Sequence, residues 1–297
     1  MLTIDRARKL LEQSCRKLYD SSELKAIGSI LLEELFSCTR TAMLLMDKNT
    51  LLSAEQEEQW IRWLHKLAEK IPLQYVLGYT FFRHHRILVA PGVLIPRPET
   101  EELVGWVLQE HHASEALNIL DVGTGSGCIA LALASELPHA QVFALEVSDK
   151  AAAVARENFL GCQKDISSRL NLITGDLFDV SSFACKMPVI DIVVSNPPYI
   201  KPGEAVAMTP GVLDYEPHGA LFVPAEDPTV FYSGIASLYG RGICSRGVEI
   251  YVEINPLLWQ ETAEAMLRVL PAGTACTERR DLSGKVRMLK LTVPSHE

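Results

Sequence analysis

A short motif after one apolar segment carries residues that could orient a planar nitrogen atom. The run from Val189 to Ser195 leads directly into Asn196-Pro197-Pro198-Tyr199. The Asn196 side-chain oxygen and the Pro197 carbonyl can both accept hydrogen bonds from one NH₂ group, and the prolines stiffen the carbonyl because their φ is fixed. Tyr199 offers an aromatic face to a planar group. An Asn-Pro turn without chemistry is the structural alternative. The pattern favours methyl transfer to an amide or arylamine nitrogen, with Asn196, Pro197 and Tyr199 in catalytic roles.

A glycine-rich loop forms the second motif. It reads Asp121-Val122-Gly123-Thr124-Gly125-Ser126-Gly127 and precedes a predicted helix. Alternate glycines allow a sharp turn and a close approach to a ligand, and the helix N-terminus favours an anionic group. Cys128 stands where a GxGxxG motif would have glycine, and the Gly-Lys-Ser/Thr of a P-loop is absent. Glu146, at the end of the next predicted strand, could bind both ribose hydroxyls. Loop and carboxylate fit NAD or S-adenosylmethionine about equally well.

Composition separates the functions that these two motifs allow. An adenine-N6 DNA methyltransferase also uses Asn-Pro-Pro-aromatic, but it needs a basic groove, and this chain has a net charge of −9. A nicotinamide-dependent oxidoreductase would have no role for Asn196 to Tyr199. A regulatory protein that binds the cofactor without turnover is a third alternative. We expect no direct nucleic-acid binding.

Cysteine and histidine spacing predicts no metal site. The seven cysteines are scattered without a CxxC, and the pairs His84-His85 and His111-His112 point apart in extended or loop structure. The charged N-terminus and the short apolar runs predict neither a signal peptide nor a membrane helix. We expect reduced thiols and a cytoplasmic protein.

Strand and helix patterns alternate through the second part of the chain. Short apolar runs predict strands, and three- and four-residue spacings predict helices between them. The expected strands are 117–122, 141–145, 170–173, 189–195 and 248–254, with a β-rich tail at 274–276 and 286–293. The expected helices are 101–109, capped by Thr100, and 129–137, 149–160 and 256–270. This order predicts an α/β fold with a mostly parallel sheet and helices on both faces.

The first part of the chain has a different pattern. Apolar residues at helical spacing predict helices from residues 4 to 18, from 22 to 36 and from 53 to 71, the last with a Ser53-x-x-Gln56 capping box. Residues 73–100 are rich in aromatic and β-branched residues and predict a β-hairpin or connecting segment. We therefore divide the chain into a helical bundle (1–72), a hairpin linker (73–100) and a catalytic domain (101–297).

Four sequence segments together resemble one enzyme family. They are NPPY, DVGTGSGCIAL from Asp121, PLQYVLG (72–78) and LIPRPETE (94–101). In combination they are similar to the protein-(glutamine-N5) methyltransferases called PrmC or HemK, which methylate the glutamine of the GGQ motif of class I peptide-chain release factors. NPPY is shared with DNA adenine methyltransferases and other amino methyltransferases, whereas PLQYVLG together with LIPRPETE is much more specific. The resemblance covers nearly the whole chain and implies a Rossmann-like class I S-adenosylmethionine-dependent methyltransferase domain.

The resemblance also implies roles for individual residues. S-adenosylmethionine would be held by Gly123, Thr124, Gly125, Ser126, Gly127, Glu146, Asp176, Leu177 and Asn196. The substrate glutamine would be held by Asn196, Pro197, Pro198 and Tyr199, and Arg97, Glu99 and Thr100 would lie near the mouth of the site. The family more often has aspartate at the position of Glu146. Class I release factors would be the partners, with the helical bundle helping to hold them. Residues 216–232 depart from the family pattern, so the resemblance implies no specific role for Asp227.

Overall fold

The computed structural model describes residues 1–295 and divides into two compact units. The first comprises residues 1–78 and 209–215, and the second comprises residues 79–208 with the chain from Glu216 onward. We call them the bundle unit and the catalytic unit and describe each by itself. None of the helices within residues 1–295 is both long and apolar enough to cross a membrane.

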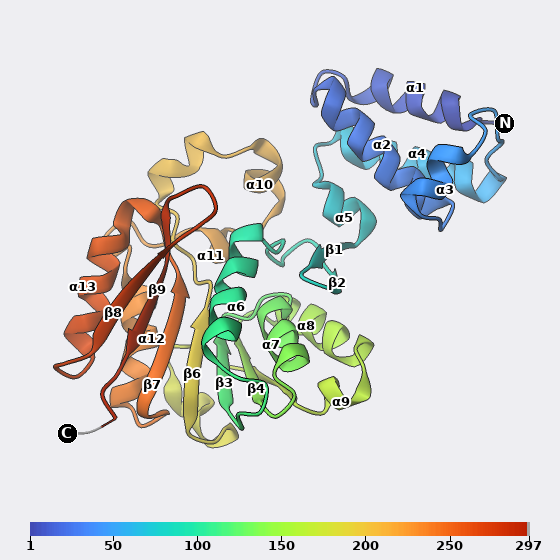
Figure 1. Ribbon diagram of the computed structural model, residues 1–297. Coiled ribbons are helices and arrows are strands. Elements are labelled where there is room, and N and C mark those ends of the chain that lie inside the picture. The colour runs from blue at the N-terminus through green and yellow to red at the C-terminus, as the bar shows by residue number, and fades with distance from the viewer. Residues whose placement is uncertain (296–297) are drawn as a thin grey trace. The chain divides into compact units, whose positions relative to one another are not determined.

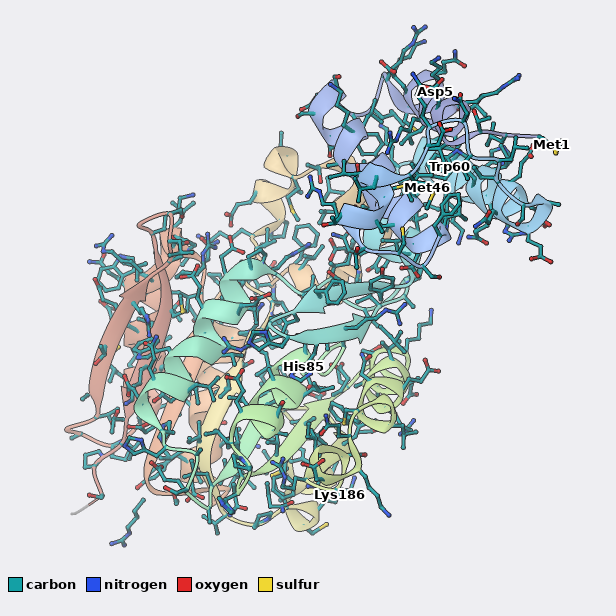
Figure 2. The ribbon with its side chains drawn as sticks, turned by 45° about the vertical axis from the view of Figure 1, so that its right-hand side comes forward. Met1, Asp5, Met46, Trp60, His85 and Lys186 are labelled. Atoms are coloured by element: carbon teal, nitrogen blue, oxygen red, sulfur yellow. The ribbon has the colours of Figure 1, made fainter. Side chains whose placement is uncertain are left out.

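The bundle unit is helical, as the apolar spacing predicts. Its helices are α1 (Ile4–Cys15), α2 (Ser21–Leu35), α3 (Arg40–Leu45), α4 (Ala54–Ala68), α5 (Leu73–Leu77) and, from later in the chain, α10 (Pro210–Tyr215). The predicted capping box is present, because Ser53 Oγ accepts from Gln56 N (3.2 Å) and Gln56 Oε1 accepts from Ser53 N (2.9 Å). Trp60 is fully buried among the helices (Figure 2). Burial of the apolar faces is therefore the main source of stability in this unit.

Residues 73–77 are helical, which corrects the prediction of hairpin or linker structure from residue 73. Leu73, Val76 and Leu77 pack against the bundle core, and this spacing of three and four is the helical one. Gly78 ends the helix in the left-handed region with φ +83°. The hairpin itself is shorter than predicted, with β1 (Tyr79–Phe82) and β2 (His85–Leu88) paired antiparallel.

A seven-stranded sheet forms the centre of the catalytic unit (Figure 1). Its order is β5 (Leu170–Thr174), β4 (Gln141–Glu146), β3 (Asn118–Val122), β6 (Ile190–Ser195), β7 (Cys244–Glu253), β9 (Val286–Thr292) and β8 (Ala275–Arg280). The first five strands are parallel, and β9 pairs antiparallel with both β7 and β8. The predicted α/β fold is confirmed. The winding reverses between β3 and β6, and such a switch point is where open parallel sheets bind ligands.

Helices cover both faces of this sheet (Figure 1). One face carries α6 (Pro98–Glu110), α7 (Cys128–Glu136) and α8 (Asp149–Gly161), and α9 (Lys164–Ser167) follows α8. The other face carries α12 (Val230–Gly240) and α13 (Trp259–Val269), whose apolar residues join the sheet in one core. The short helix α11 (His218–Leu221) and helix α12 were not predicted.

Helix α6 begins earlier than the sequence pattern indicates. It starts at Pro98, with Arg97 at the N-cap position, so Thr100 lies inside the first turn and is not the cap. Proline suits this first position because the N–H that it lacks would have no partner there. The Thr100 hydroxyl is consequently free to bond elsewhere in the catalytic unit.

Candidate active site

A cavity of about 320 Å³ lies in the catalytic unit where β3, β4 and β6 end. It is lined by residues at and after the ends of these three strands and after β5, by part of the segment Gly92–Thr100, and by Pro217, Gly219, Ala220 and Phe231. The volume is at the lower end of the range for small-molecule sites. The sheet therefore brings the two predicted motifs to one cavity.

The glycine-rich loop after β3 turns through three left-handed residues. Gly123, Gly125 and Gly127 have φ of +70°, +57° and +81°, values that other residues rarely adopt. A Cβ on Gly127 would lie 2.5 Å from a Phe159 ring carbon, so this position also excludes any side chain by contact. Gly123, Thr124, Gly125 and Ser126 line the cavity, whereas Gly127 packs against α8 and is not among the lining residues.

Two buried side chains beneath the loop hold its shape. Asp121 Oδ2 accepts from Thr124 Oγ1 (2.5 Å) and from Ala130 N (3.2 Å), and burial raises the pKa of Asp121 to about 7. Asn158 Nδ2 donates to the carbonyls of Ser126 (2.8 Å) and Leu88 (3.1 Å). Sequence analysis missed Asn158, because only the fold brings α8 beside the loop.

Glu146 lies at the end of β4 and faces the loop. Its side chain is buried, with Oε2 accepting from Gly125 N (2.8 Å) and Oε1 accepting from Ser148 N (2.8 Å). A carboxylate has about four acceptor positions, so both oxygens retain capacity for a ligand that enters the cavity.

Asp176 and Leu177, after β5, also line the cavity. Asp176 Oδ1 accepts from Phe178 N at 2.9 Å, which fixes the turn. The rings of Phe178 and Phe231 lie 5.7 Å apart and contribute apolar lining that sequence analysis did not single out. Phe178 could have been predicted from its position directly after Leu177. Phe231 could not, because it lies in the segment that diverges from the family pattern.

Asn196, Pro197 and Pro198 line the cavity at the end of β6. Asn196 Nδ2 donates to Thr100 Oγ1 at 2.9 Å. Within residues 1–295, no group of the protein donates to Asn196 Oδ1 or to the Pro197 carbonyl oxygen. Two neighbouring acceptors therefore remain for a ligand.

Tyr199 is half-buried and is not among the lining residues. Its hydroxyl donates to Glu253 Oε1 at 3.0 Å, and burial raises its pKa. Thr100 donates to the other oxygen of the same carboxyl, Oε2, at 2.7 Å. Sequence analysis missed Glu253 at the end of β7. The contact predicted between Tyr199 and a substrate stays a prediction.

The segment around Arg97 is tied down by a buried carboxylate. Glu216 Oε1 accepts from Arg97 Nη2 (2.6 Å), and its Oε2 accepts from Ile95 N (3.1 Å). Arg97 and Thr100 line the cavity, whereas Glu99 does not. Asp227 accepts from Thr229 N at 3.0 Å and is likewise not among the lining residues. The divergent segment thus supplies Glu216, whose carboxylate fixes the segment around Arg97.

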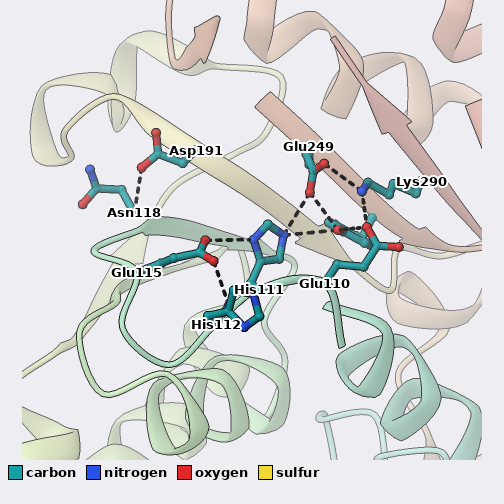
Figure 3. A network of polar contacts seen from close by, with 9 residues as sticks. Glu110, His111, His112, Glu115, Asn118, Asp191, Glu249 and Lys290 are labelled. Carbon is teal, nitrogen blue, oxygen red and sulfur yellow. Dashed lines mark hydrogen bonds and ion pairs between the residues drawn. The ribbon is translucent and has the colours of Figure 1, made fainter. Parts of the chain in front are cut away.

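The histidine pairs take structural positions. His84 and His85 lie in the hairpin. His111, the residue after α6, forms a network with Glu115 and Glu249 (Figure 3). Its Nε2 also lies 3.2 Å from the Tyr251 hydroxyl. Within residues 1–295, no cluster of three or more histidine, cysteine and acidic side chains is arranged to hold a metal ion.

Comparison with known proteins gives matches to both parts of the chain. The family model described as PrmC N-terminal domain matches residues 3–78, and the one described as Methyltransferase small domain matches residues 103–210. Two relatives named release factor glutamine methyltransferase match almost from end to end. The protein from Flavobacterium psychrophilum is 38% identical over 98% of this chain and 99% of its own length. The protein from Bacteroides thetaiotaomicron is 36% identical over 96% and 99%, respectively.

A solved structure gives a further match. The crystal structure of a protein-(glutamine-N5) methyltransferase (release factor-specific) from Alicyclobacillus acidocaldarius is 26% identical and covers 69% of this chain and 98% of that chain, with a TM-score of 0.42.

Proposed function

Since the chain belongs to the release factor glutamine methyltransferase family, we propose that it transfers a methyl group from S-adenosylmethionine to N5 of the glutamine in the GGQ motif of class I release factors. The proposal places the enzyme in the cytoplasm, where release factors act.

The pair of free acceptors at the end of β6 is the observation that carries the proposal. Asn196 Oδ1 and the Pro197 carbonyl oxygen belong to adjacent residues that both line the cavity. A glutamine carboxamide has two N–H donors on one nitrogen, so two such acceptors match its NH₂ group. An amine or a hydroxyl group would not require this planar pairing.

The residues at the glycine-rich loop fit S-adenosylmethionine. The three left-handed glycines bring backbone close to the cavity without a Cβ, and Glu146 has acceptor capacity for the ribose hydroxyls. Asp176 and Leu177 would lie by the adenine, with Phe178 as a further apolar contact. Gly127 would act through the shape of the loop, because it packs against Phe159.

The mechanism follows from orientation. When bound, S-adenosylmethionine supplies an electrophilic methyl group on a sulfonium centre. The nitrogen of a carboxamide is a poor nucleophile because its lone pair is delocalised. Asn196 and the Pro197 carbonyl would hold the NH₂ group, favour positive charge on its nitrogen and direct the lone pair at the methyl carbon. Proximity and alignment of this kind supply about 7–11 kcal/mol of barrier reduction. The methylated, charged amide then loses a proton to water, so no general base is needed.

The bundle unit would hold the protein substrate. Its match to the PrmC N-terminal domain supports this role, and so do two exposed leucines on α3, Leu44 and Leu45, which are 74% and 84% exposed. Large apolar groups left exposed on one short helix are candidate contacts for a protein partner.

Labelled methyl transfer tests the proposed function. The protein is incubated with S-adenosylmethionine carrying a labelled methyl group and with a class I release factor, with the same release factor lacking the GGQ glutamine, or with duplex DNA. We expect label on the intact release factor only. Label on DNA would instead favour an adenine-N6 methyltransferase, and label on none of the three would contradict the proposal.

A further inference from the structure

A chain of hydrogen bonds leads from Asn196 into the interior of the catalytic unit. Asn196 Nδ2 donates to Thr100 Oγ1 (2.9 Å), and Thr100 Oγ1 donates to Glu253 Oε2 (2.7 Å). Tyr199 donates to Glu253 Oε1 (3.0 Å). Thr100 is 2% exposed and Glu253 is 1% exposed, so water does not compete for these bonds. We call these four residues the relay.

The direction of each bond in the relay follows from the number of protons available. An ionised carboxylate only accepts, and each hydroxyl has one hydrogen to donate. The hydroxyl groups of Thr100 and Tyr199 both donate their hydrogen bond to Glu253. The Thr100 oxygen can then only accept, and it accepts from the NH₂ end of Asn196. The Asn196 oxygen therefore stays free for the cavity.

Protonation of Glu253 would remove this constraint. A carboxylic acid can donate to Thr100, and the Thr100 hydrogen could then turn toward Asn196. The asparagine oxygen would be a suitable partner for it, which allows the carboxamide to flip. A flipped Asn196 presents NH₂ to the cavity, and two NH₂ groups facing one another cannot form the required hydrogen bond.

We propose that Thr100 and Glu253 are positioning residues, which fix the Asn196 carboxamide with its oxygen toward the substrate amide. The inference rests on the proposed function, because it assigns the asparagine oxygen to the glutamine NH₂. Thr100, in the first turn of α6, and Glu253, at the end of β7, would support the acceptor pair without contacting the substrate.

The surroundings of Glu253 place its titration in an accessible range. Its pKa is raised to about 7 by burial and by the charge of Glu99, against the hydrogen bonds from Thr100 and Tyr199 and the positive charge of Arg287, which lower the pKa. Tyr232, from α12, donates to the Glu253 backbone carbonyl (3.0 Å), and Arg287 is itself paired with Asp281 (3.2 Å). The ionised form is the productive one, so kcat should fall as the pH drops through about 7.

Two matched variants of Thr100 distinguish a positioning role of its hydroxyl group from a packing role of its methyl group. Thr100→Val keeps the side-chain volume and removes the hydroxyl, whereas Thr100→Ser removes the methyl group and keeps the hydroxyl. We expect kcat on a release factor to fall about 10- to 100-fold in the valine variant. The serine variant should stay within about threefold of the wild-type kcat, and KM should change little in either variant. Packing alone would give the opposite ranking.

Thr262→Val is the control for the loss of a buried hydroxyl. Thr262 lies on α13, is 1% exposed, and its hydroxyl has no partner within residues 1–295. This variant should keep the wild-type kcat. Thermal unfolding and the dissociation constant for S-adenosylmethionine, measured on all three variants, show whether each still folds and binds.

The pH profile provides the readout that a structural role would not change. The wild-type kcat should rise from about pH 6 to about pH 8, and Glu253→Gln should lose this acid limb. Equal kcat values for the valine and serine variants, or an unchanged acid limb in Glu253→Gln, would overturn the inference while leaving the proposed function intact. A wild-type protein that methylates no release factor would contradict the proposed function and the inference with it.

Discussion

At the scale of single residues, the site depends on which atoms are left without a partner. The NH₂ group of Asn196 donates to Thr100, which leaves the Asn196 side-chain oxygen as a free acceptor. The Pro197 carbonyl oxygen also receives no donor within residues 1–295. Both residues that the motif suggested as acceptors line the cavity, and their role in binding an amide stays a prediction. It could not identify which end of the Asn196 carboxamide faces the cavity, because Thr100 and Glu253 are 96 and 153 residues from their partners in the chain.

Replacement of Asn196 by alanine should separate reaction from cofactor binding. The variant loses one of the two acceptors, while the glycine-rich loop and Glu146 stay in place. We expect kcat to fall at least about 100-fold and the dissociation constant for S-adenosylmethionine to rise less than about tenfold. Single-turnover transfer and calorimetric titration measure the two effects. Equal losses in both would assign Asn196 to cofactor binding alone.

At the scale of elements, α6 connects the cavity with the opposite end of the sheet. Its first turn carries Thr100, and its C-terminal end carries Glu110 and His111. His111 Nε2 lies 2.9 Å from Glu249 Oε2 of β7, and its Nδ1 lies 3.4 Å from Glu115 (Figure 3). Lys290 of β9 pairs with Glu110 and with Glu249 (2.7 Å). A protonated histidine also suits the negative end of the helix dipole.

This network predicts a pH dependence of stability. Burial lowers the pKa of His111, but the hydrogen bonds and charges of Glu249 and Glu115 outweigh it and raise the pKa above the usual 6.5. A histidine with a raised pKa in the folded state stabilises the protein below pH 6.5, and this contribution is lost as the pH rises through the raised pKa. Its loss should lower the free energy of unfolding by about 1 kcal/mol.

Urea unfolding on either side of that transition measures the effect. His111→Gln should lower stability at acidic pH and remove the dependence, whereas the exposed neighbour His112→Gln serves as the control. A wild-type protein and a His111→Gln variant with the same pH dependence would show that the histidine does not titrate as expected.

Sequence patterns predicted the strands better than the elements between them. Short apolar runs rich in β-branched residues, such as 189–195, are typical of buried strands, and all the predicted strands formed. Tyr75 and Val76 favour strands, so the sequence predicts residues 73–77 as part of the hairpin segment. The segment is helical instead, because a helix lets Leu73, Val76 and Leu77 pack together against the bundle core. Glu216 could not be found from sequence, since only the fold brings it to Arg97.

At the scale of the whole molecule, the two units are not two consecutive pieces of sequence. Residues 209–215 belong to the bundle unit, where Tyr215 donates to the carbonyl of Glu69 at 2.6 Å. The chain then enters the catalytic unit at Glu216, whose carboxylate holds Arg97 and Ile95. The bundle unit is therefore built from two separate segments of sequence, which a division into consecutive domains does not predict.

The division into units predicts separate effects on long and short substrates. Leu44→Ser combined with Leu45→Ser should raise KM for an intact release factor at least about tenfold, because burial of even one leucine contributes about 1.5–3 kcal/mol and a tenfold change corresponds to about 1.4 kcal/mol. Transfer to a short GGQ peptide should not change. The control is Leu160→Ser, on α8 of the catalytic unit, where the leucine is 73% exposed. An unchanged KM for the release factor would exclude α3 from recognition.

Tandem mass spectrometry of the release factor after incubation with S-adenosylmethionine identifies the residue and the atom that receive the methyl group. If a planar acceptor pair holds a carboxamide, one methyl group must appear on the side-chain nitrogen of the GGQ glutamine. The expected result is a gain of a single methyl group on that residue and its loss in the Asn196→Ala reaction. A methyl group on a hydroxyl, carboxyl or amine side chain, or none on the glutamine, would contradict the account.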